Sequence, residues 1–235
     1  MASSRRHRLA HCRRRYLAVV IRDATRELVV GRIGSGKTTR ALELTGGRPR
    51  VVAWDPLGQY PREHGFSRAD SLVQVLGQLS RRWAKSFKIA YVPQGDPVAA
   101  LHGLSVLLWE AQAHYEDGRD PRKLTLIAEE LNLGFPSHAL PKGQRGFRKL
   151  TLQGRHRGVD IVGVTQRPAD IGAAFRGQVS RTYILPLEDE IEIAWALRKI
   201  GRERNAELRA LKPHHYFEYS EGEVKKGKNR RRRKY

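Results

Sequence analysis

The chain has 235 residues, of which 40% are hydrophobic and 29% charged, enough for a buried core under a heavily solvated surface. This composition excludes a wholly disordered chain, and the single cysteine, Cys12, excludes an internal disulfide framework and a cysteine-based zinc site. Lysine and arginine outnumber the acids 45 to 24, and the resulting net charge of +21 favours a polyanionic partner.

Most of the excess positive charge lies at the two ends of the chain. Residues 1–15 contain six arginines and residues 225–235 contain eight basic residues, with no acid in either stretch. Blocks of like charge repel one another, stay unfolded and often bind nucleic acid. We therefore predict a basic arm over residues 1–15, one domain over 16–220 and a basic tail over 221–235. A role in solubility or localisation is the alternative for both ends.

The sequence predicts no membrane span. The longest apolar candidate, Leu17–Ile21, has the length of a strand, whereas a spanning helix needs about 18 apolar residues or more. The basic start is not followed by an apolar stretch of signal-peptide length.

Between the ends, short apolar runs alternate with helical stretches. We predict strands over Leu17–Arg22, Glu27–Val30, Arg50–Trp54, Lys88–Val92, Leu124–Ala128, Asp160–Gln166, Arg181–Pro186 and Tyr216–Tyr219. We predict helices over Lys37–Leu44, Ala69–Ser86, Val98–Tyr115, Gly143–Arg157, Ala169–Arg176, Glu190–Lys199 and Glu203–Leu211. This alternation is typical of βαβ units, and it predicts a single α/β domain with a mainly parallel sheet flanked by helices.

A glycine-rich segment follows the strand that ends at Val30 and precedes the helix that begins at Lys37. It matches the phosphate-binding pattern G-x-x-x-x-G-K-[ST] at every fixed position. The glycines let successive backbone N–H groups face one anion, and the helix adds its positive amino end. The predicted nucleotide-binding residues are Gly31, Arg32, Ile33, Gly34, Ser35, Gly36, Lys37, Thr38 and Thr39.

Within this segment, Lys37 is predicted to contact the β- and γ-phosphates of a nucleotide, and the Thr38 hydroxyl to bind Mg²⁺. A glycine- and serine-rich turn that matches by chance is the alternative, but the flanking strand and helix are the context that the motif requires.

Two acids, Glu129 and Glu130, end the strand over Leu124–Ala128. Ligands of α/β sheets lie at the carboxyl ends of the strands, so this pair is a candidate for orienting Mg²⁺ and polarising an attacking water. We assign Glu129 to Mg²⁺ and Glu130 to the attacking water. An ordinary solvated pair that opens a helix is the alternative.

A third element combines Gln166, at the end of the strand over Asp160–Gln166, with Arg155 and Arg157 just before that strand. The Gln166 amide can sense the γ-phosphate or the lytic water. Arg155 or Arg157 can act in trans on a neighbour's γ-phosphate, as an arginine finger does. Plain surface charge is the equally weighted alternative for the two arginines.

These segments together resemble the FtsK/HerA superfamily of DNA-pumping ATPases. The resemblance rests on Gly31–Thr38, on Leu126–Glu130 and on Gly158–Pro168, and it covers residues 27 to 187. The Thr-Gln-Arg-Pro run at 165–168 is similar to the FtsK translocases. Phe135-Pro136 and Arg155–Arg157 are similar to zonula occludens toxin and filamentous-phage assembly ATPases. The compact size is most similar to genome-packaging ATPases of tailless, membrane-containing double-stranded DNA viruses.

The resemblance implies a RecA-like fold in a homo-oligomeric ring, usually a hexamer, with double-stranded DNA in its channel. It implies ATP and Mg²⁺ as cofactors, Lys37 and Thr38 as phosphate and Mg²⁺ ligands, Glu130 as the base and Gln166 as the sensor. The usual Asp-Glu pair is Glu129-Glu130 here, so the metal geometry at Glu129 departs from the family pattern.

The predicted function is an ATP-driven translocase of double-stranded DNA that packages a viral genome, located in the host cytoplasm or the virion. A capsid or portal-vertex protein is a candidate partner. Two other functions stay open: an assembly or secretion ATPase that acts on protein, and a nucleic-acid-binding protein that holds nucleotide without turnover. A small-molecule kinase is disfavoured, because it would not need the Gln166 strand or the basic ends.

Overall fold

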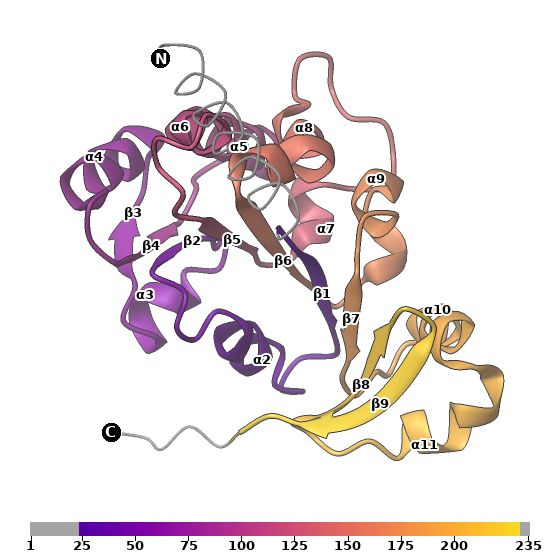
Figure 1. Ribbon diagram of the computed structural model, residues 1–235. Coiled ribbons are helices and arrows are strands. Elements are labelled where there is room, and N and C mark those ends of the chain that lie inside the picture. Colours follow the sequence, from indigo (N-terminus) through magenta and orange to yellow (C-terminus); the bar gives the residue numbers. More distant parts are fainter. Residues whose placement is uncertain (1–23, 231–235) are drawn as a thin grey trace, which may run out of the picture.

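The computed structural model describes residues 24–230, which form one sheet with helices on both faces (Figure 1). The sheet has nine strands in the order β3-β4-β2-β5-β6-β1-β7-β8-β9. Strands β1 to β7 are parallel, and β8 and β9 extend the sheet as an antiparallel hairpin. The predicted α/β fold with a mainly parallel sheet is therefore confirmed. The predicted strand Leu17–Arg22 and the arm over 1–15 lie outside the described residues.

The strands are β1 (Arg26–Val30), β2 (Arg50–Trp54), β3 (Ser67–Ala69), β4 (Phe87–Tyr91), β5 (Leu124–Ala128), β6 (Val159–Thr165), β7 (Arg181–Ile184), β8 (His215–Ser220) and β9 (Glu223–Lys228). The α-helices are α2 (Lys37–Leu44), α3 (Gln59–Glu63), α4 (Leu72–Arg82), α5 (Pro97–Ala111), α6 (Ala113–Glu116), α7 (Leu131–Gly134), α8 (Gly146–Gln153), α9 (Ala173–Arg176), α10 (Glu190–Ile200) and α11 (Asn205–Arg209). Short 3₁₀ turns are η1 (Gly154–Arg157), η2 (Pro168–Asp170) and η3 (Arg202–Arg204).

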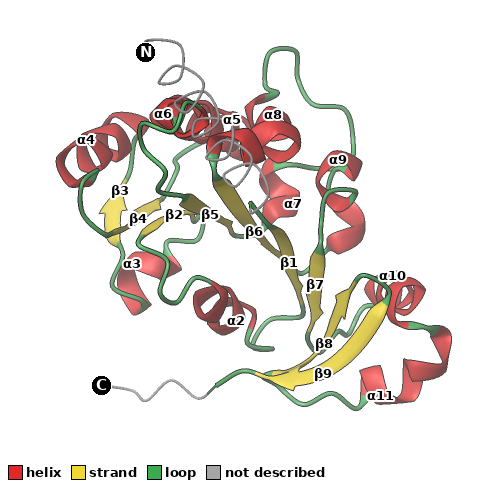
Figure 2. Ribbon diagram, in the orientation of Figure 1, coloured by secondary structure: helices red, strands yellow, loops and turns green. Residues whose placement is uncertain are grey.

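The central strands are buried on both faces, as their near-continuous apolar runs predict. In β1, Leu28 and Val30 pack into the core under α5 and α8, whereas Val29 packs against Ala41 and Leu42 of α2 on the other face. Figure 2 shows α5 and α8 on the opposite side of the sheet from α2. Side chains of β1 thus alternate between the two faces with a period of two residues. This alternation fixes the register of β1, the strand that leads into the glycine-rich segment.

Four predicted helices are longer than the observed α-helices, and a fifth, over Val98–Tyr115, is divided at Gln112 into α5 and α6. The helix predicted over Ala169–Arg176 retains only α9, and the one predicted over Glu203–Leu211 retains only α11, because a 3₁₀ turn forms the first part of each segment. The other two cases begin late or end early. The helix predicted over Ala69–Ser86 begins only at Leu72, because Ala69 belongs to β3 and Ser71 caps the helix by accepting the N–H of Gln74 at 3.3 Å. The helix predicted over Gly143–Arg157 spans only α8, and its last residues form the tighter turn η1.

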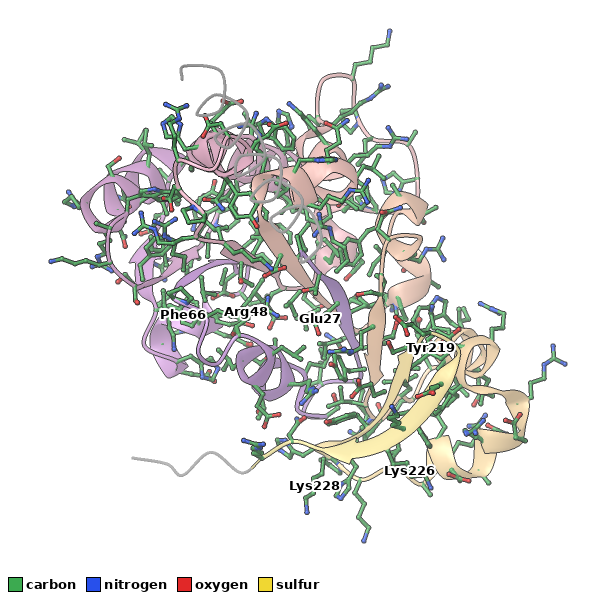
Figure 3. The ribbon with its side chains drawn as sticks, in the orientation of Figure 1. Glu27, Arg48, Phe66, Tyr219, Lys226 and Lys228 are labelled. Atoms are coloured by element: carbon green, nitrogen blue, oxygen red, sulfur yellow. The ribbon has the colours of Figure 1, made fainter. Side chains whose placement is uncertain are left out.

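The predicted basic tail is in part a strand. Residues Glu223–Lys228 pair with β8 along its whole length as β9. The two-residue turn at Glu221 and Gly222 has positive φ at both positions, 52° and 84°, which is the geometry of a type I′ hairpin. Lys226 and Lys228 lie on this edge strand (Figure 3), where charged side chains oppose edge-to-edge association.

Gly158, between η1 and β6, leaves no room for a side chain. Its φ is +61°, and a Cβ there would lie 2.3 Å from the Tyr115 ring. We expect Gly158→Ala to lower the free energy of unfolding by about 2–4 kcal/mol, from backbone strain and overpacking together. Chemical denaturation measures this. Gly118→Ala is the matched control, because Gly118 has φ +75° with nothing within 4 Å of its Cβ position. Equal losses in the two variants would contradict a packing role for Gly158.

Candidate nucleotide-binding site

The sheet order brings the predicted site residues to one edge. The segment Gly31–Thr39 follows β1, the pair Glu129-Glu130 follows β5, and Gln166 follows β6. Because β6 lies between β1 and β5 and all three strands are parallel, their carboxyl ends are neighbours. This edge is where α/β sheets bind ligands.

The turn from β1 into α2, residues Gly31–Thr38, is called the phosphate loop below. Gly34 and Gly36 have φ of +71° and +100°, which an L side chain rarely adopts. The loop is held by its neighbours: the Gly31 N–H donates to the Thr165 carbonyl at 3.3 Å, and the Arg32 N–H donates to the Pro186 carbonyl at 2.8 Å.

The side chains of the phosphate loop differ in exposure. Ile33 at its tip is 77% exposed, whereas Ser35 is fully buried. Thr38 and Thr39 lie half-buried in the first turn of α2, where the free N–H groups of a helix and its dipole attract anions. Thr38 therefore lies in the first turn of α2, and its role as a Mg²⁺ ligand stays a prediction.

Lys37 is 8% exposed, and its Nζ donates to the Arg32 carbonyl at 3.1 Å, across its own loop. Burial lowers the pKa of Lys37, and the negative charges of Glu130 and Glu129 oppose that shift. The lysine and both acids therefore share one electrostatic environment. A phosphate bound between Lys37 and the two acids would contact an ammonium group that the Arg32 carbonyl already holds in place.

Glu130 and Gln166, predicted as base and sensor, contact each other directly. The Gln166 Nε2 donates to the Glu130 Oε1 at 2.8 Å. Glu130 has φ 42° and ψ 52°, a left-handed conformation that is uncommon outside glycine. Such strained conformations are found at functional sites. Here the left-handed conformation forms the turn between β5 and α7, at the residue whose carboxylate accepts the Gln166 hydrogen bond.

Glu129 lies deeper, in a setting that sequence reasoning missed. It is 5% exposed, and its Oε1 accepts the hydroxyl of the fully buried Tyr60 at 2.8 Å. The backbone N–H of Tyr60 in turn donates to Asp55 Oδ2 at 2.8 Å, and Asp55 follows the neighbouring strand β2. Burial raises the pKa of Glu129 to about 7, while the Tyr60 hydrogen bond opposes this. Burial therefore favours the protonated form of Glu129 more than it would for an exposed glutamate.

The donor set fits Mg²⁺ that arrives with a nucleotide. The Thr38 hydroxyl and the ionised Glu129 carboxylate supply hard oxygen ligands, and phosphates and water usually complete the shell of this ion. Over residues 24–230 no group of three or more His, Cys, Asp or Glu side chains could hold a metal ion by itself.

Tyr60→Phe is expected to make stability more sensitive to pH. The pKa of Glu129 is raised in the folded state, so its contribution to stability is fully present below the unfolded pKa and falls as pH rises towards about 7. Without the Tyr60 hydroxyl the folded pKa rises further, and the loss extends to higher pH. In metal-free buffer, the variant should lose more unfolding free energy at pH 8 than at pH 5. A loss of equal size at both values would contradict this role for Tyr60.

Arg155 and Arg157 are not brought to this edge. Both lie in η1, which precedes β6, so they sit at the amino edge of the sheet. Arg155 is exposed, and the Arg157 guanidinium lies 4.7 Å from the Trp109 ring centroid and 3.5 Å from Glu116 Oε2. At the same amino edge, Arg48 pairs with the buried Glu27 at 3.2 Å (Figure 3). A role on γ-phosphate therefore requires a second copy of the chain and stays a prediction.

The arrangement of sheet, loop and flanking helices is the α/β fold of P-loop ATPase structures. The genome packaging NTPase B204 of Sulfolobus turreted icosahedral virus 2, in complex with sulfate, aligns over 89% of this chain and 98% of its own, with a TM-score of 0.65 and 19% identity. VirB4 of Thermoanaerobacter pseudethanolicus aligns over 90% and 91%, with a TM-score of 0.62 and 11% identity. These likenesses establish the fold.

The N-terminal domain of zonular occludens toxin from Neisseria meningitidis also matches, over 74% of this chain and 90% of its own at 14% identity, but its TM-score of 0.40 supports no argument. No protein-family model and no curated protein sequence matches the chain.

Proposed function

We propose that the protein is an ATPase that translocates double-stranded DNA, as a viral genome-packaging motor does. The observation that carries this is the meeting of the phosphate loop, Glu130 and Gln166 at one edge of the sheet, with Gln166 bonded to Glu130 at 2.8 Å. The similar structure B204 is named a genome packaging NTPase, and it has been solved in complex with AMPPCP and with ATP-gammaS.

The residues divide the chemistry among themselves. Backbone N–H groups of the phosphate loop bind the phosphates, and Lys37 neutralises the charge that develops on the transferred group. Thr38 and Glu129 would hold Mg²⁺, which supplies charge neutralisation on the phosphate oxygens when bound. Glu130 orients the attacking water and takes its proton. Gln166 links the position of Glu130 to the γ-phosphate.

A second copy of the chain is expected to pack against this edge. Three large apolar side chains are exposed in the segments that follow β1, β2 and β5: Ile33 in the phosphate loop at 77%, Leu57 in a turn at 52% and Leu133 in α7 at 45%. A partner that packs on this edge would remove their apolar surface from water. A homo-oligomeric ring, as the FtsK/HerA resemblance implies, would cover them and could supply Arg155 or Arg157 to the neighbour's ATP.

A basic stretch of the sequence that contains no acid supports the choice of DNA as the substrate. Residues 131–159 contain no acid and six basic residues: Lys142, Arg145, Arg148, Lys149, Arg155 and Arg157. Arg145 and Arg148, together with His138, line a hollow of about 420 Å³ whose lining includes no acid. Among the described residues, neither arginine has an ion-pair partner. Free guanidinium groups in a hollow suit the phosphates of a nucleic acid backbone.

The double variant Arg145→Ala/Arg148→Ala is expected to weaken binding to duplex DNA and to reduce the slope of log affinity against log salt by about 2, because each arginine would neutralise one phosphate. Fluorescence anisotropy over a salt series measures both quantities. Arg198→Ala/Arg202→Ala is the control, because these exposed arginines of α10 and η3 have no ion-pair partner within residues 24–230 and lie outside the basic stretch. If the salt slope of Arg145→Ala/Arg148→Ala equalled that of the unmodified chain, the proposed contact between these arginines and DNA would be contradicted.

One assay separates the candidate functions. ATP turnover is measured with and without long duplex DNA, and stimulation by DNA supports the motor. Turnover that is indifferent to DNA would favour an assembly or secretion ATPase acting on protein. No turnover would favour a nucleotide-holding, nucleic-acid-binding protein. Over residues 24–230, none of the helices has the length and apolar character needed to cross a bilayer.

The location and the outside partner belong to the same proposal. A packaging motor would act in the host cytoplasm or at a vertex of the virion, and there it would contact a capsid or portal-vertex protein. Copurification of the chain with the shell of assembled particles would support this location.

A further inference from the structure

The hairpin of β8 and β9 contacts the phosphate loop through two of the backbone carbonyls of the loop. The backbone N–H of His214, just before β8, donates to the Ser35 carbonyl at 2.7 Å. The side-chain Nδ2 of Asn229, just after β9, donates to the Gly36 carbonyl at 2.9 Å. The Asn229 N–H also donates to the His214 carbonyl at 2.8 Å, which ties the two ends of the hairpin together. Two successive carbonyls of the loop thus accept hydrogen bonds from one element, and the Gly36 carbonyl also accepts the Arg40 N–H of α2 at 3.0 Å.

Peptide geometry gives these contacts a consequence for phosphate binding. In a trans peptide unit the C=O and the N–H point in opposite directions. The Ser35 carbonyl shares its unit with the Gly36 N–H, and the Gly36 carbonyl shares its unit with the Lys37 N–H. When the hairpin holds both carbonyls outward, both N–H groups are turned to the opposite side. That side is the concave face on which such a loop binds an anion.

The fit between hairpin and loop is close. A Cβ at Gly36 would lie 2.5 Å from His214 Nδ1 and 3.0 Å from Asn229 Nδ2. His214 itself has φ +68°, an uncommon conformation for a residue with a side chain. The hairpin end is therefore shaped to the backbone of the loop, and it leaves room only for glycine at position 36.

Asn229 is also costly to bury. It is 3% exposed, and its Oδ1 has no hydrogen-bond partner among the described residues. A buried amide oxygen without a partner lowers stability by about 1–3 kcal/mol. Packing alone would favour an apolar side chain here, and the hydrogen bond that the Asn229 amide makes to the loop is what an apolar residue would lack.

We propose that Asn229 and the backbone of His214 are positioning residues for the phosphate loop. They hold the Ser35 and Gly36 carbonyls so that the N–H groups of Gly36 and Lys37 face the phosphates of a bound nucleotide. This inference rests on the proposed function, since it requires the loop to bind a nucleoside polyphosphate.

The test compares binding of AMPPCP and of adenosine, which has no phosphate, to the full chain by calorimetry. Asn229→Ala and Asn229→Ser should bind AMPPCP at least tenfold more weakly, with adenosine binding unchanged. In ATP turnover, KM should rise about tenfold while kcat changes much less, because the loop N–H groups bind the phosphates in the ground state and the transition state alike. Two substitutions are used so that one that fails to fold does not leave the proposal untested.

One further variant separates positioning from general stability. Lys228→Ala, at the exposed neighbour of Asn229, should bind AMPPCP normally. AMPPCP affinity within twofold of the unmodified chain in a folded Asn229 variant would overturn the inference. Failure of the unmodified chain to bind AMPPCP at all would instead overturn the proposed function.

Discussion

Lys37→Ala is expected to lower ATP turnover at least about a hundredfold while leaving the fold intact. Lys37 is the buried cation between the phosphate loop and the two acids, and its Nζ is already directed across the loop to the Arg32 carbonyl. Alanine removes the charge that would stabilise the transferred phosphoryl group. It keeps the first position of α2 helical, because alanine is the best helix former.

Steady-state turnover and a thermal melt measure the two halves of this expectation. The matched control is Lys85→Ala, since Lys85 is an exposed lysine that lies between α4 and β4 and away from the site. Normal turnover in Lys37→Ala would contradict the site. A large fall in melting temperature would instead show that Lys37 acts through the fold.

Glu130→Gln is expected to abolish hydrolysis but to preserve nucleotide binding. Glutamine has the same shape, and its Oε1 can still accept the hydrogen bond from Gln166, so the geometry between β5 and β6 should persist. The substitution removes the negative charge that takes a proton from water. Loss of a general base typically costs a factor of about 10² to 10⁴ in rate.

Glu129→Gln is the comparison that distinguishes the two acids. This variant should weaken the dependence of binding on Mg²⁺, since Glu129 is assigned to the metal. Single-turnover hydrolysis and a Mg²⁺ titration on both variants give the answer. Full activity in Glu130→Gln together with none in Glu129→Gln would mean that the roles are exchanged.

The order of chain elements could be predicted from the sequence because the central strands are unambiguous. Runs such as Leu124–Ala128 are buried on both faces and lie between turns, so their bounds match the observed strands. Short elements were missed, because three to five residues give too little periodicity: β3, α3 and α7 are the examples. The strand β9 could not be predicted from its composition, because four of its six residues are Lys or Glu. It forms a strand only through its pairing with β8.

The site shows the same division between local and long-range information. The phosphate loop, Glu130 and Gln166 were predictable because each is the end of a recognisable strand, and parallel strands put such ends together. Tyr60 could not be found in this way. It lies in the short helix α3, and only the packing of that helix brings its hydroxyl to Glu129. Asn229 is separated from Gly36 by 193 residues, and no sequence pattern links them.

The position of β6 has a consequence for how subunits of a ring could act in sequence. Its seven residues span about 23 Å, with Arg155 and Arg157 just before one end and Gln166 just after the other. If those arginines contact the ATP of the neighbouring subunit, β6 connects Gln166, at the γ-phosphate of one subunit, to the arginines at the ATP of the next. ATP hydrolysis would then proceed from subunit to subunit around the ring in one direction. ATP saturation curves should therefore be sigmoidal, with a Hill coefficient above one.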